Sequence, residues 1–389
     1  MRALSYLEIN TFCILIILLL FSCHRGNGDT RPSARFFRGL LISLIVYALL
    51  DMLCGLQENY VIHPAPWVVE IMNVLFFYSA ATVSFLGFLY AECEFGGTWF
   101  HDRRKWLLFS LPMLIQLITI PLSLYGKFYF YIDRLGRYTK GPLYPLLLAL
   151  CYSYLMVIGV RSMYAVFRKA NYAHRSEYLS IASLVVFPLI TGVIQALNTG
   201  ISIACIGATL ACLQVFVNLQ QAQITIDPLT QINNRTKMLH YLDKCISRQK
   251  SGGDRKLAVY MIDINDFKQI NDQHGHLEGD AALIFLSEVL KQVASHFKGL
   301  ISRFGGDEFF VVLEARDDAE VEQFRQELLD ALDAYNASSG KPYKLSIGMG
   351  LAYYAPALTI PDLIDAADQA LYREKRRYKH SKKGHGYFH

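Results

Sequence analysis

The sequence has few charged residues and no cysteine pattern of a known kind. Only 18% of its 389 residues are Asp, Glu, Lys or Arg, and the formal net charge is +5. A charge this small does not predict the basic surface of a nucleic-acid-binding protein, so we expect no nucleic acid partner. The eight cysteines show no spacing typical of a zinc site or a disulfide framework. We therefore expect the globular part of the chain to lie in a reducing compartment.

Apolar residues are in excess and make up 53% of the chain, too many for an ordinary soluble enzyme. They concentrate in residues 1–219, where seven segments are long enough to cross a hydrocarbon layer of about 30 Å. These segments are Leu4–Cys23, Phe36–Leu56, Trp67–Tyr90, Lys105–Tyr125, Leu143–Phe167, Tyr178–Leu197 and Ile201–Leu219. The sequence therefore predicts an all-α polytopic membrane bundle of about seven helices over residues 1–219.

Two of these segments allow another interpretation. Only Asn198-Thr199-Gly200 separates the last two, so one long span is the alternative, although about 40 apolar residues exceed a single crossing. The first segment could be a cleaved signal peptide, but only Arg2 precedes its apolar core and an arginine-rich stretch follows it.

Lysine and arginine are distributed unevenly among the loops. The first, third and fifth loops are basic, and the second and sixth carry neither residue. The fourth loop is also basic and so breaks this alternation. The residues concerned are Arg25, Arg31, Arg35, Arg38, Arg103, Arg104, Lys105, Arg168, Lys169 and Arg175, against Lys127, Arg134, Arg137 and Lys140 in the fourth loop. The bias predicts a multi-pass protein of the inner (cytoplasmic) membrane, in contact with lipid, with its N-terminus outside and its C-terminal domain in the cytoplasm.

Polar side chains within the spans are costly in lipid and are often functional. Asp51 and Glu70 both fall toward the outer side, where they either share a ligand or ion cavity or lie at the interface with local donors. Arg161, late in the fifth span, is expected to extend to the cytoplasmic interface. The largest external loop, Gly126–Gly141, is short, so an unknown stimulus must be read by the bundle or by a partner.

The remaining residues read as a short junction and a globular domain. Residues 220–226 continue the last span as a helix without a Gly/Ser linker, and a stiff connection of this kind transmits motion better than a flexible one. Residues 227–389 alternate strand and helix patterns, which predicts an α/β or α+β domain with one layered sheet. The helices are expected at Asn234–Gln249, Phe267–Asp272, Asp280–Phe297, Ala319–Asn336 and Pro361–Tyr378, and the strands at residues 256–262, 299–302, 309–313 and 343–354.

Two adjacent carboxylates, Asp307 and Glu308, follow Gly305-Gly306 at the tip of a predicted hairpin. The glycines supply the positive φ of a tight turn and leave backbone open to a phosphate group. Asp263 ends another predicted strand, so its carboxylate meets the tip if the strands are neighbours. Oxygen ligands alone favour Mg²⁺ or Mn²⁺. Taken singly, Asp263 could equally be a strand-end cap and Asp307 a turn residue.

The segment after Asp263 is rich in residues suited to a nucleotide. Lys268 offers an ammonium group to a phosphate. Asn271 and Asp280 offer an amide and a carboxylate to the edge of guanine, where Asp accepts from N1–H and the 2-amino group. His276 either orients one of these groups or makes a structural turn contact.

This pattern resembles the GGDEF family of diguanylate cyclases. The resemblance rests on five motifs in order, between about Ile226 and Lys379. They are Asp227-Pro228-Leu229-Thr230 with Asn234-Arg235, the segment 263–280, Gly305-Gly306-Asp307-Glu308-Phe309, Ser346-Ile347-Gly348, and Ala366-Ala367-Asp368-Gln369-Ala370-Leu371-Tyr372. It implies a membrane-bound enzyme with an α+β, nucleotidyl-cyclase-like (ferredoxin-like palm) domain. It further implies a homodimer, paired through this domain and the membrane helices, that makes cyclic di-GMP from two GTP and releases pyrophosphate.

The resemblance also implies roles for single residues. Asp263, Asp307 and Glu308, with the Ile264 carbonyl, correspond to the metal site, and Asp307 and Glu308 to the catalytic carboxylates. The substrate-binding positions are Lys268, Asn271, His276, Asp280, Gly305, Gly306, Lys375 and Lys379.

The chain departs from the family pattern at four places. Gln231 replaces a glycine, Asn265 stands where a second Asp is common, and Lys379 replaces an arginine. His296-Phe297-Lys298-Gly299 occupies the place of the Arg-x-x-Asp product-inhibition site, which we therefore expect to be absent. The alternatives to an active cyclase are a catalytically silent receptor for GTP or cyclic di-GMP and a membrane receptor or transporter whose cytoplasmic domain only dimerises.

Overall fold

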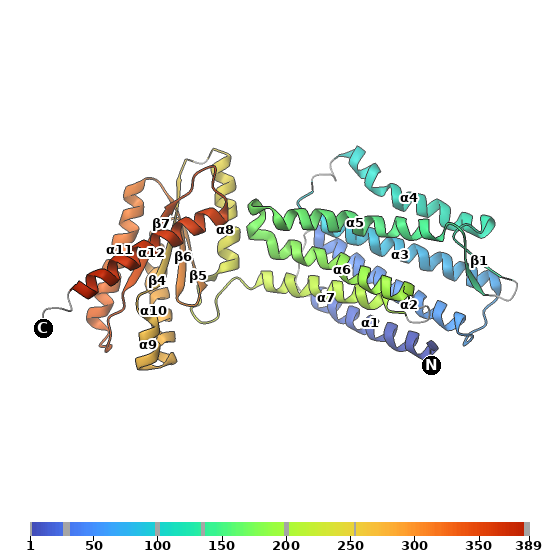
Figure 1. Ribbon diagram of the computed structural model, residues 1–389, viewed down its shortest axis with the longest axis horizontal. Helices are drawn as coiled ribbons and strands as arrows, with labels where there is room; N and C mark the ends of the chain where they lie inside the picture. Colours follow the sequence, from blue (N-terminus) through green and yellow to red (C-terminus); the bar gives the residue numbers. More distant parts are fainter. Residues whose placement is uncertain are drawn as a thin grey trace. The chain divides into compact units, whose positions relative to one another are not determined.

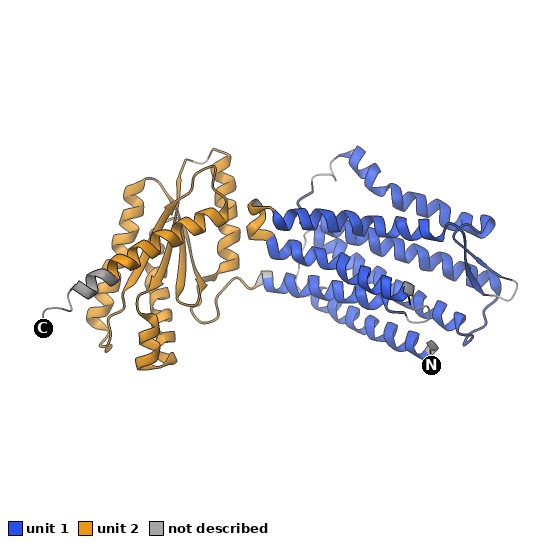
Figure 2. Ribbon diagram, viewed as in Figure 1, with its two compact units in different colours: residues 1–167, 175–221 blue, residues 168–174, 222–389 orange. Residues whose placement is uncertain are grey.

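The computed structural model describes residues 2–25, 32–97, 102–133, 137–197, 202–252 and 254–384. The chain forms two compact units, which Figure 2 colours separately. Residues 1–167 and 175–221 make up the first, here called the membrane unit. Residues 168–174 and 222–389 make up the second, the C-terminal unit. The C-terminal unit therefore includes a short segment from the predicted membrane half.

Seven long helices build the membrane unit (Figure 1), and each is long and apolar enough to cross a membrane. They are α1 (Arg2–Arg25), α2 (Pro32–Glu58), α3 (Pro66–Glu94), α4 (Arg103–Gly126), α5 (Tyr144–Phe167), α6 (Arg175–Leu197) and α7 (Ala204–Gln223). The prediction of a seven-helix bundle is confirmed. Leucine side chains exposed around these helices are what a lipid-facing surface requires.

The last two spans are separate helices. Gly207 of α7 lies so close to α6 that an added Cβ would be 2.1 Å from Thr191 Oγ1 and 2.7 Å from the Phe187 carbonyl oxygen. The side-chain oxygen of Gln195 accepts hydrogen bonds from the N–H groups of Ile203 (3.1 Å) and Ala204 (2.8 Å). These contacts fold α7 back along α6, so the alternative of one long span is wrong. The turn predicted at residues 198–200 lies outside the described residues.

The predicted external loop Gly126–Gly141 contains a small hairpin. Strand β1 (Phe130–Ile132) pairs antiparallel with β2 (Tyr138–Lys140). The Ser123 hydroxyl at the end of α4 accepts from the N–H groups of Tyr129 (2.9 Å) and Phe130 (3.2 Å). Phe130 is fully buried, and its ring centroid lies 5.3 Å from that of Phe77 on α3. The hairpin is therefore anchored on the bundle.

Arg161 on α5 has partners within the bundle. Its guanidinium forms an ion pair with Glu92 of α3 and lies 5.0 Å from the ring centroid of Phe95. The Glu92 side chain is only 2% exposed, so the arginine supplies the counter-charge that a carboxylate in this setting needs. The extension of Arg161 to the cytoplasmic interface stays a prediction, and sequence spacing did not identify Glu92 as its partner.

A five-stranded sheet organises the C-terminal unit, in the order β3-β5-β6-β4-β7. All neighbours are antiparallel except β3 and β5. The strands are β3 (Asn233–Asn234), β4 (Lys256–Ile264), β5 (Gly299–Gly305), β6 (Glu308–Ala315) and β7 (Ile347–Tyr353). The helices are α8 (Arg235–Lys250), α9 (Phe267–His274), α10 (His276–Ala294), α11 (Asp318–Ser338), α12 (Ile360–Gly384) and the 3₁₀ helix η2 (Lys169–His174). The prediction of an α+β domain is confirmed.

Helices cover both faces of this sheet. Successive side chains of β4 point to opposite faces and therefore pack in two separate cores. Ala258, Tyr260 and Ile262 pack with α10 and α11 on one face. Leu257, Val259 and Met261 pack with α8 and α12 on the other. Strand β4 is central and buried on both sides, which holds its C-terminal end at a defined place.

The segment η2 belongs to the second of these cores. Ala173 is buried there beside Tyr172, whose hydroxyl accepts a hydrogen bond from Arg235 at 2.8 Å. Lys169 also forms an ion pair with Asp362 at 3.5 Å. Helix α7 ends at Gln223, so the predicted helical junction over residues 220–226 is wrong for its last three residues.

A buried carboxylate network on β6 is expected to stabilise the C-terminal unit. Glu314 is 5% exposed and accepts from Tyr241 at 2.8 Å, with Arg248 at 3.1 Å and Lys298 at 3.5 Å. Replacing Glu314 with alanine leaves Tyr241 without its acceptor and should lower the free energy of unfolding by about 2 kcal/mol. Thermal unfolding of the purified protein measures the loss. The exposed Glu288→Ala should change it by less than about 0.5 kcal/mol, and equal losses would contradict this role for Glu314.

Candidate functional site

The hairpin between β5 and β6 is held in a fixed conformation. Gly306 has φ +45°, a backbone conformation that favours glycine. The Arg303 side chain donates from Nε to the Gly306 carbonyl at 2.9 Å and forms an ion pair with Asp227 at 3.2 Å. Asp227 in turn accepts from the backbone and the hydroxyl of Thr230. Arg303 thus joins the hairpin tip to the turn at residues 227–230.

Two departures from the family pattern, Gln231 and Asn265, lie near this hairpin. Gln231 follows the turn at residues 227–230 and has φ +54°, in the left-handed region that the family's glycine adopts without strain. Asn265 donates from its backbone N–H to the Ser346 carbonyl (2.8 Å) and from Nδ2 to the Ser346 hydroxyl (3.2 Å). Both substitutions therefore affect local backbone structure. Asn265 is directed at the start of β7.

The register of the sheet brings the predicted carboxylates together. Asp263 at the end of β4 lies directly opposite Glu308 at the start of β6, next to Asp307 at the tip. Asp263 is 8% exposed, whereas Asp307 and Glu308 are partly exposed. Ile264 follows in β4, its side chain in the core and its backbone paired with Ile347. The predicted convergence of Asp263 with the hairpin is observed.

The electrostatics of this cluster show an excess of negative charge. Burial raises the pKa of Asp263, and the charges of Asp307 and Asp368 raise it further, while the ion pair with Lys375 lowers it. Burial also raises the pKa of Glu308, with smaller contributions from Asp263 and Asp307. Oxygen donors that repel one another in this way fit a divalent cation of the Mg²⁺ or Mn²⁺ type.

A cavity of about 460 Å³ opens beside the carboxylates. Asp263 and Glu308 form one wall, and α12 supplies the other. The α12 residues that line it are Asp368, Gln369, Leu371, Tyr372, Arg373 and Lys375. Helix α12 is seated by Gly350 of β7, where an added Cβ would lie 2.1 Å from the Ala367 carbonyl oxygen.

Asp368 and Arg373 were not predicted as site residues. For Asp368 the sequence did contain a signal: Asp368, Tyr372 and Lys375 are four and three residues apart and therefore share one face of a helix. Lys379 continues this spacing, but its side chain lies outside the described residues. Lys375 and Arg373 place two cations on the cavity wall.

The two predicted guanine-binding residues are brought together where α9 meets α10. Gly279 lies so close to Asn271 that an added Cβ would be 2.0 Å from Asn271 Oδ1. Asp280 follows directly, in the second turn of α10. Lys268 and His276 are exposed, and no contact within the described part of the chain joins them to the carboxylates.

The residues at the place of the family's product-inhibition site form contacts with other side chains. His296 Nδ1 lies 3.0 Å from Glu327 Oε2, and Lys298 pairs with Glu314 at 3.5 Å. The absence of a product site at this place stays a prediction.

Comparison with known proteins identifies relatives of the C-terminal unit. The family model "Diguanylate cyclase, GGDEF domain" matches residues 224–381. Diguanylate cyclase DgcP of Pseudomonas aeruginosa is 37% identical over 164 residues, which are 40% of this chain and 23% of that protein. An uncharacterized 19.3 kDa protein of Streptomyces ambofaciens is 34% identical over 155 residues, covering 39% of this chain and 78% of that protein. The chain spans about a fifth of the length of the first curated relatives that it matches.

Solved structures also match part of the chain. A sensory box/GGDEF family protein from Caulobacter crescentus CB15 is 34% identical, with a TM-score of 0.35, and the match covers 39% of this chain and 99% of that one. A GGDEF-only form of PA1120 from Pseudomonas aeruginosa is 30% identical, with a TM-score of 0.36 and coverages of 39% and 89%.

Proposed function

Because this chain belongs to the GGDEF domain family, we propose that its C-terminal unit is a diguanylate cyclase that joins two GTP molecules into cyclic di-GMP. The observation that carries the proposal is the register of β4 and β6, which sets Asp263 opposite Glu308 and beside Asp307. Further support comes from the cations of α12, which suit a triphosphate, and from the Asn271–Asp280 pair, which suits guanine.

Each group has a physical task in this reaction. Asp263, Asp307 and Glu308, with the Ile264 carbonyl, would hold Mg²⁺ or Mn²⁺, which neutralises phosphate charge and lowers the pKa of the attacking 3′-hydroxyl. Lys375 and Arg373 bind the triphosphate through their charge. The open backbone at Gly305 and Gly306 gives the phosphates room. Asp280 and Asn271 fix the guanine and so align the nucleotide.

The chemistry requires two copies of the domain. The 3′-oxygen of each GTP forms a bond to the α-phosphorus of the other, the bond to pyrophosphate breaks, and the hydroxyl proton is released. One domain binds one GTP, so two domains must face each other, and alignment of the two nucleotides is a large part of the rate enhancement. We propose that the homodimer pairs through the C-terminal unit and the membrane helices.

The membrane unit is proposed to regulate this activity. The lysine and arginine bias of the loops supports a multi-pass arrangement in the inner membrane, with the N-terminus outside. The C-terminal unit then lies in the cytoplasm, where GTP is present. Arg31, which supports this bias, and Arg134, which runs against it, lie outside the described residues.

A direct assay tests the activity. The full-length protein is purified in lipid nanodiscs and incubated with GTP and Mg²⁺ or Mn²⁺, and the products are identified by mass spectrometry. Cyclic di-GMP is expected, and it should disappear when EDTA removes the divalent cation or when ATP replaces GTP. A dimeric protein that forms no cyclic di-GMP with either cation would contradict the proposal.

The contact between Gly279 and Asn271 predicts a selective defect. In Gly279→Ala the new methyl group displaces the Asn271 amide, so KM for GTP should rise about tenfold, the equivalent of one hydrogen bond. Steady-state kinetics of Gly279→Ala, Asn271→Ala and the double variant test this. The double variant should be no worse than Asn271→Ala alone. Additive losses would show that Gly279 acts independently of Asn271.

A further inference from the structure

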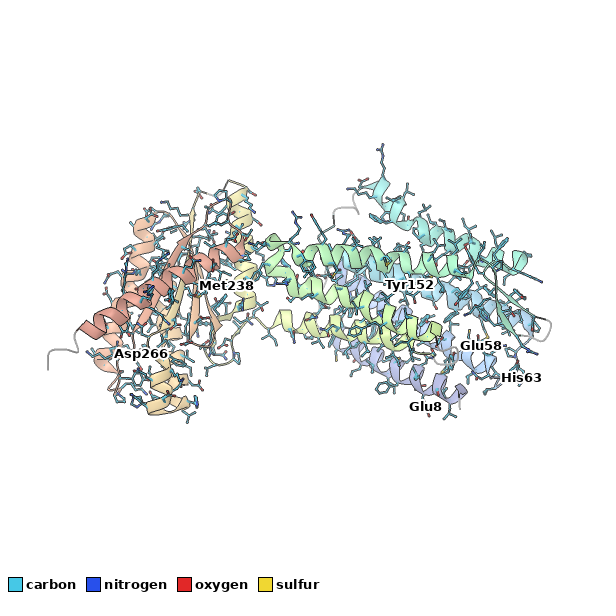
Figure 3. The ribbon with its side chains drawn as sticks, in the orientation of Figure 1. Glu8, Glu58, His63, Tyr152, Met238 and Asp266 are labelled. Atoms are coloured by element: carbon cyan, nitrogen blue, oxygen red, sulfur yellow. The ribbon has the colours of Figure 1, made fainter. Side chains whose placement is uncertain are left out.

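A second cavity, of about 660 Å³, lies within the membrane unit. Helices α1, α2, α3, α5, α6 and α7 contribute to its wall, and β2 borders it at the hairpin end of the bundle. Figure 3 labels two lining residues, Glu58 at the end of α2 and Tyr152 nearer the middle of the bundle. The volume lies within the range of about 300–1,000 Å³ that small-molecule sites occupy.

Aromatic side chains form much of the wall. They are Tyr6, Tyr47, Tyr60, Phe76, Phe77, Tyr138, Tyr144 and Tyr152. The rings of Tyr47 and Phe76 stack with centroids 5.2 Å apart, and Phe77 meets Tyr144 edge-on at 6.3 Å. A wall of this kind accommodates an apolar body, and its ring faces attract a cation. Lys140 already lies 5.1 Å from the Tyr144 ring centroid.

Two carboxylates line the same cavity. Asp51 is 5% exposed, and its Oδ2 accepts from Asn10 Nδ2 at 2.8 Å and from the Ser202 hydroxyl. Both donors are neutral, so they orient the carboxylate without supplying a counter-charge. Glu58 is exposed and lies two helical turns further along α2, about 10 Å away. Glu70, the other acid singled out from the sequence, does not line the cavity.

Asp51 has no positive partner within the described part of the chain, whereas the charge of Lys140 acts on Glu58. No lysine, arginine or histidine in the part of the chain that the structure describes forms an ion pair with Asp51 or Glu58. Two cations also line the cavity at β2: Arg137 Nε lies 4.0 Å from Asp133 Oδ2, and Lys140 Nζ lies over the Tyr144 ring. A buried carboxylate between membrane helices is costly unless a positive charge compensates it. Glu92, in the same unit, has such a partner in Arg161.

We propose that this cavity binds a small organic ammonium compound with an aromatic or aliphatic body. The ammonium group lies at Asp51, the body lies against the aromatic wall, and Glu58 adds negative charge toward β2. A bare divalent cation fits less well, because Mg²⁺ and Ca²⁺ require six or more oxygen ligands and most of the wall is aromatic or aliphatic. An organic anion would be repelled at Asp51, which has no positive partner among the described residues.

A graded set of ligands tests the charge requirement. The full-length protein is placed in phosphatidylglycerol nanodiscs, which contain no amine lipid, and titrated calorimetrically at neutral pH. The probes are 2-phenylethylamine, 2-phenylethanol and 3-phenylpropionate, which carry the same ring with a positive, neutral and negative group. The amine should bind at least about tenfold more tightly than the alcohol, and the acid should bind more weakly than both. Equal affinities, or no binding of the amine, would overturn the proposal.

Matched variants locate the interaction. Asp51→Asn keeps the acceptor oxygen for Asn10 and Ser202 and should abolish the preference for the amine, whereas Glu58→Gln should reduce it. Glu70→Gln, outside the cavity, should leave it unchanged. If Asp51→Asn does not fold, the exposed Glu58→Gln decides, and an undiminished preference there would contradict the proposal.

The source of the ammonium group can be distinguished in the same system. Adding phosphatidylethanolamine to the nanodiscs should weaken the apparent affinity for 2-phenylethylamine if a lipid headgroup occupies the site, and should leave it unchanged if the ligand is a free amine. A change in cyclase rate on amine binding rests on the proposed function. The calorimetric titration does not rest on it. A failure to detect cyclase activity would therefore leave the amine-binding proposal intact, and a failure of amine binding would leave the proposed cyclase activity intact.

Discussion

Replacing Asp307 with asparagine should lower kcat for cyclic di-GMP formation by about 10³-fold or more, which is about 4 kcal/mol. The substitution keeps the size of the side chain but removes one of three clustered carboxylates. Without that carboxylate charge we expect the site to hold a divalent cation poorly. The negative charge of the triphosphate is then only partly neutralised. Initial rates at saturating GTP, measured across a series of Mg²⁺ concentrations, give the size of the effect.

The control for this experiment is Asp333→Asn, an equivalent change on the exposed surface of α11. It should leave the rate and the thermal unfolding temperature unchanged. Asp307→Asn should also unfold at the parent temperature or above, because the change relieves repulsion with Asp263 and Glu308. A variant that unfolds normally and retains more than about a tenth of the parent rate would refute the assignment of Asp307.

Replacing Asp280 with asparagine should change which purine the enzyme accepts. In the proposed site the carboxylate would accept from guanine N1–H and from the 2-amino group, and such a two-bond contact is worth about 1–3 kcal/mol of discrimination. We therefore expect kcat/KM for GTP to fall about 100-fold in Asp280→Asn. The fall for ITP, which lacks the 2-amino group, should be smaller, so the GTP:ITP ratio contracts.

Asp272→Asn serves as the matched control, because this residue is exposed on α9 next to Asn271. Its GTP:ITP ratio should equal that of the parent protein. An Asp280→Asn variant with an unchanged ratio would show that Asp280 does not contact the base, even if its overall rate had fallen.

The sheet of the C-terminal unit was predictable because its signals are local. Two apolar runs around a Gly-Gly pair predict a hairpin, and a buried run that ends in Asp263 predicts a central strand. Asp263 comes to lie beside Asp307 only if these strands are neighbours, and the register of β4 and β6 supplies that pairing. Strand β7 was predicted from residue 343 but begins at Ile347, because Leu345 exchanges backbone hydrogen bonds with the Asn336 side chain.

Pairings across the bundle were not predictable. Helical periodicity shows which residues share a face, but not which residue on another helix they meet. Asp51 with Ser202 and Glu92 with Arg161 are contacts of this type. For the same reason Glu58 was overlooked: at the end of a span it reads as an interfacial residue, and only the position of β2 makes it part of a cavity wall.

The inclusion of η2 in the C-terminal unit bears on how this protein is cut for study. A fragment that begins at residue 222 lacks Tyr172 and Ala173, although both pack with Met238, Leu242 and Leu363 in one apolar cluster. Such a truncation would expose apolar surface on α8 and α12 and would favour aggregation that the intact chain avoids. Grafting residues 168–174 back through a short tether, or working with the whole polypeptide, is the safer route to a well-behaved sample.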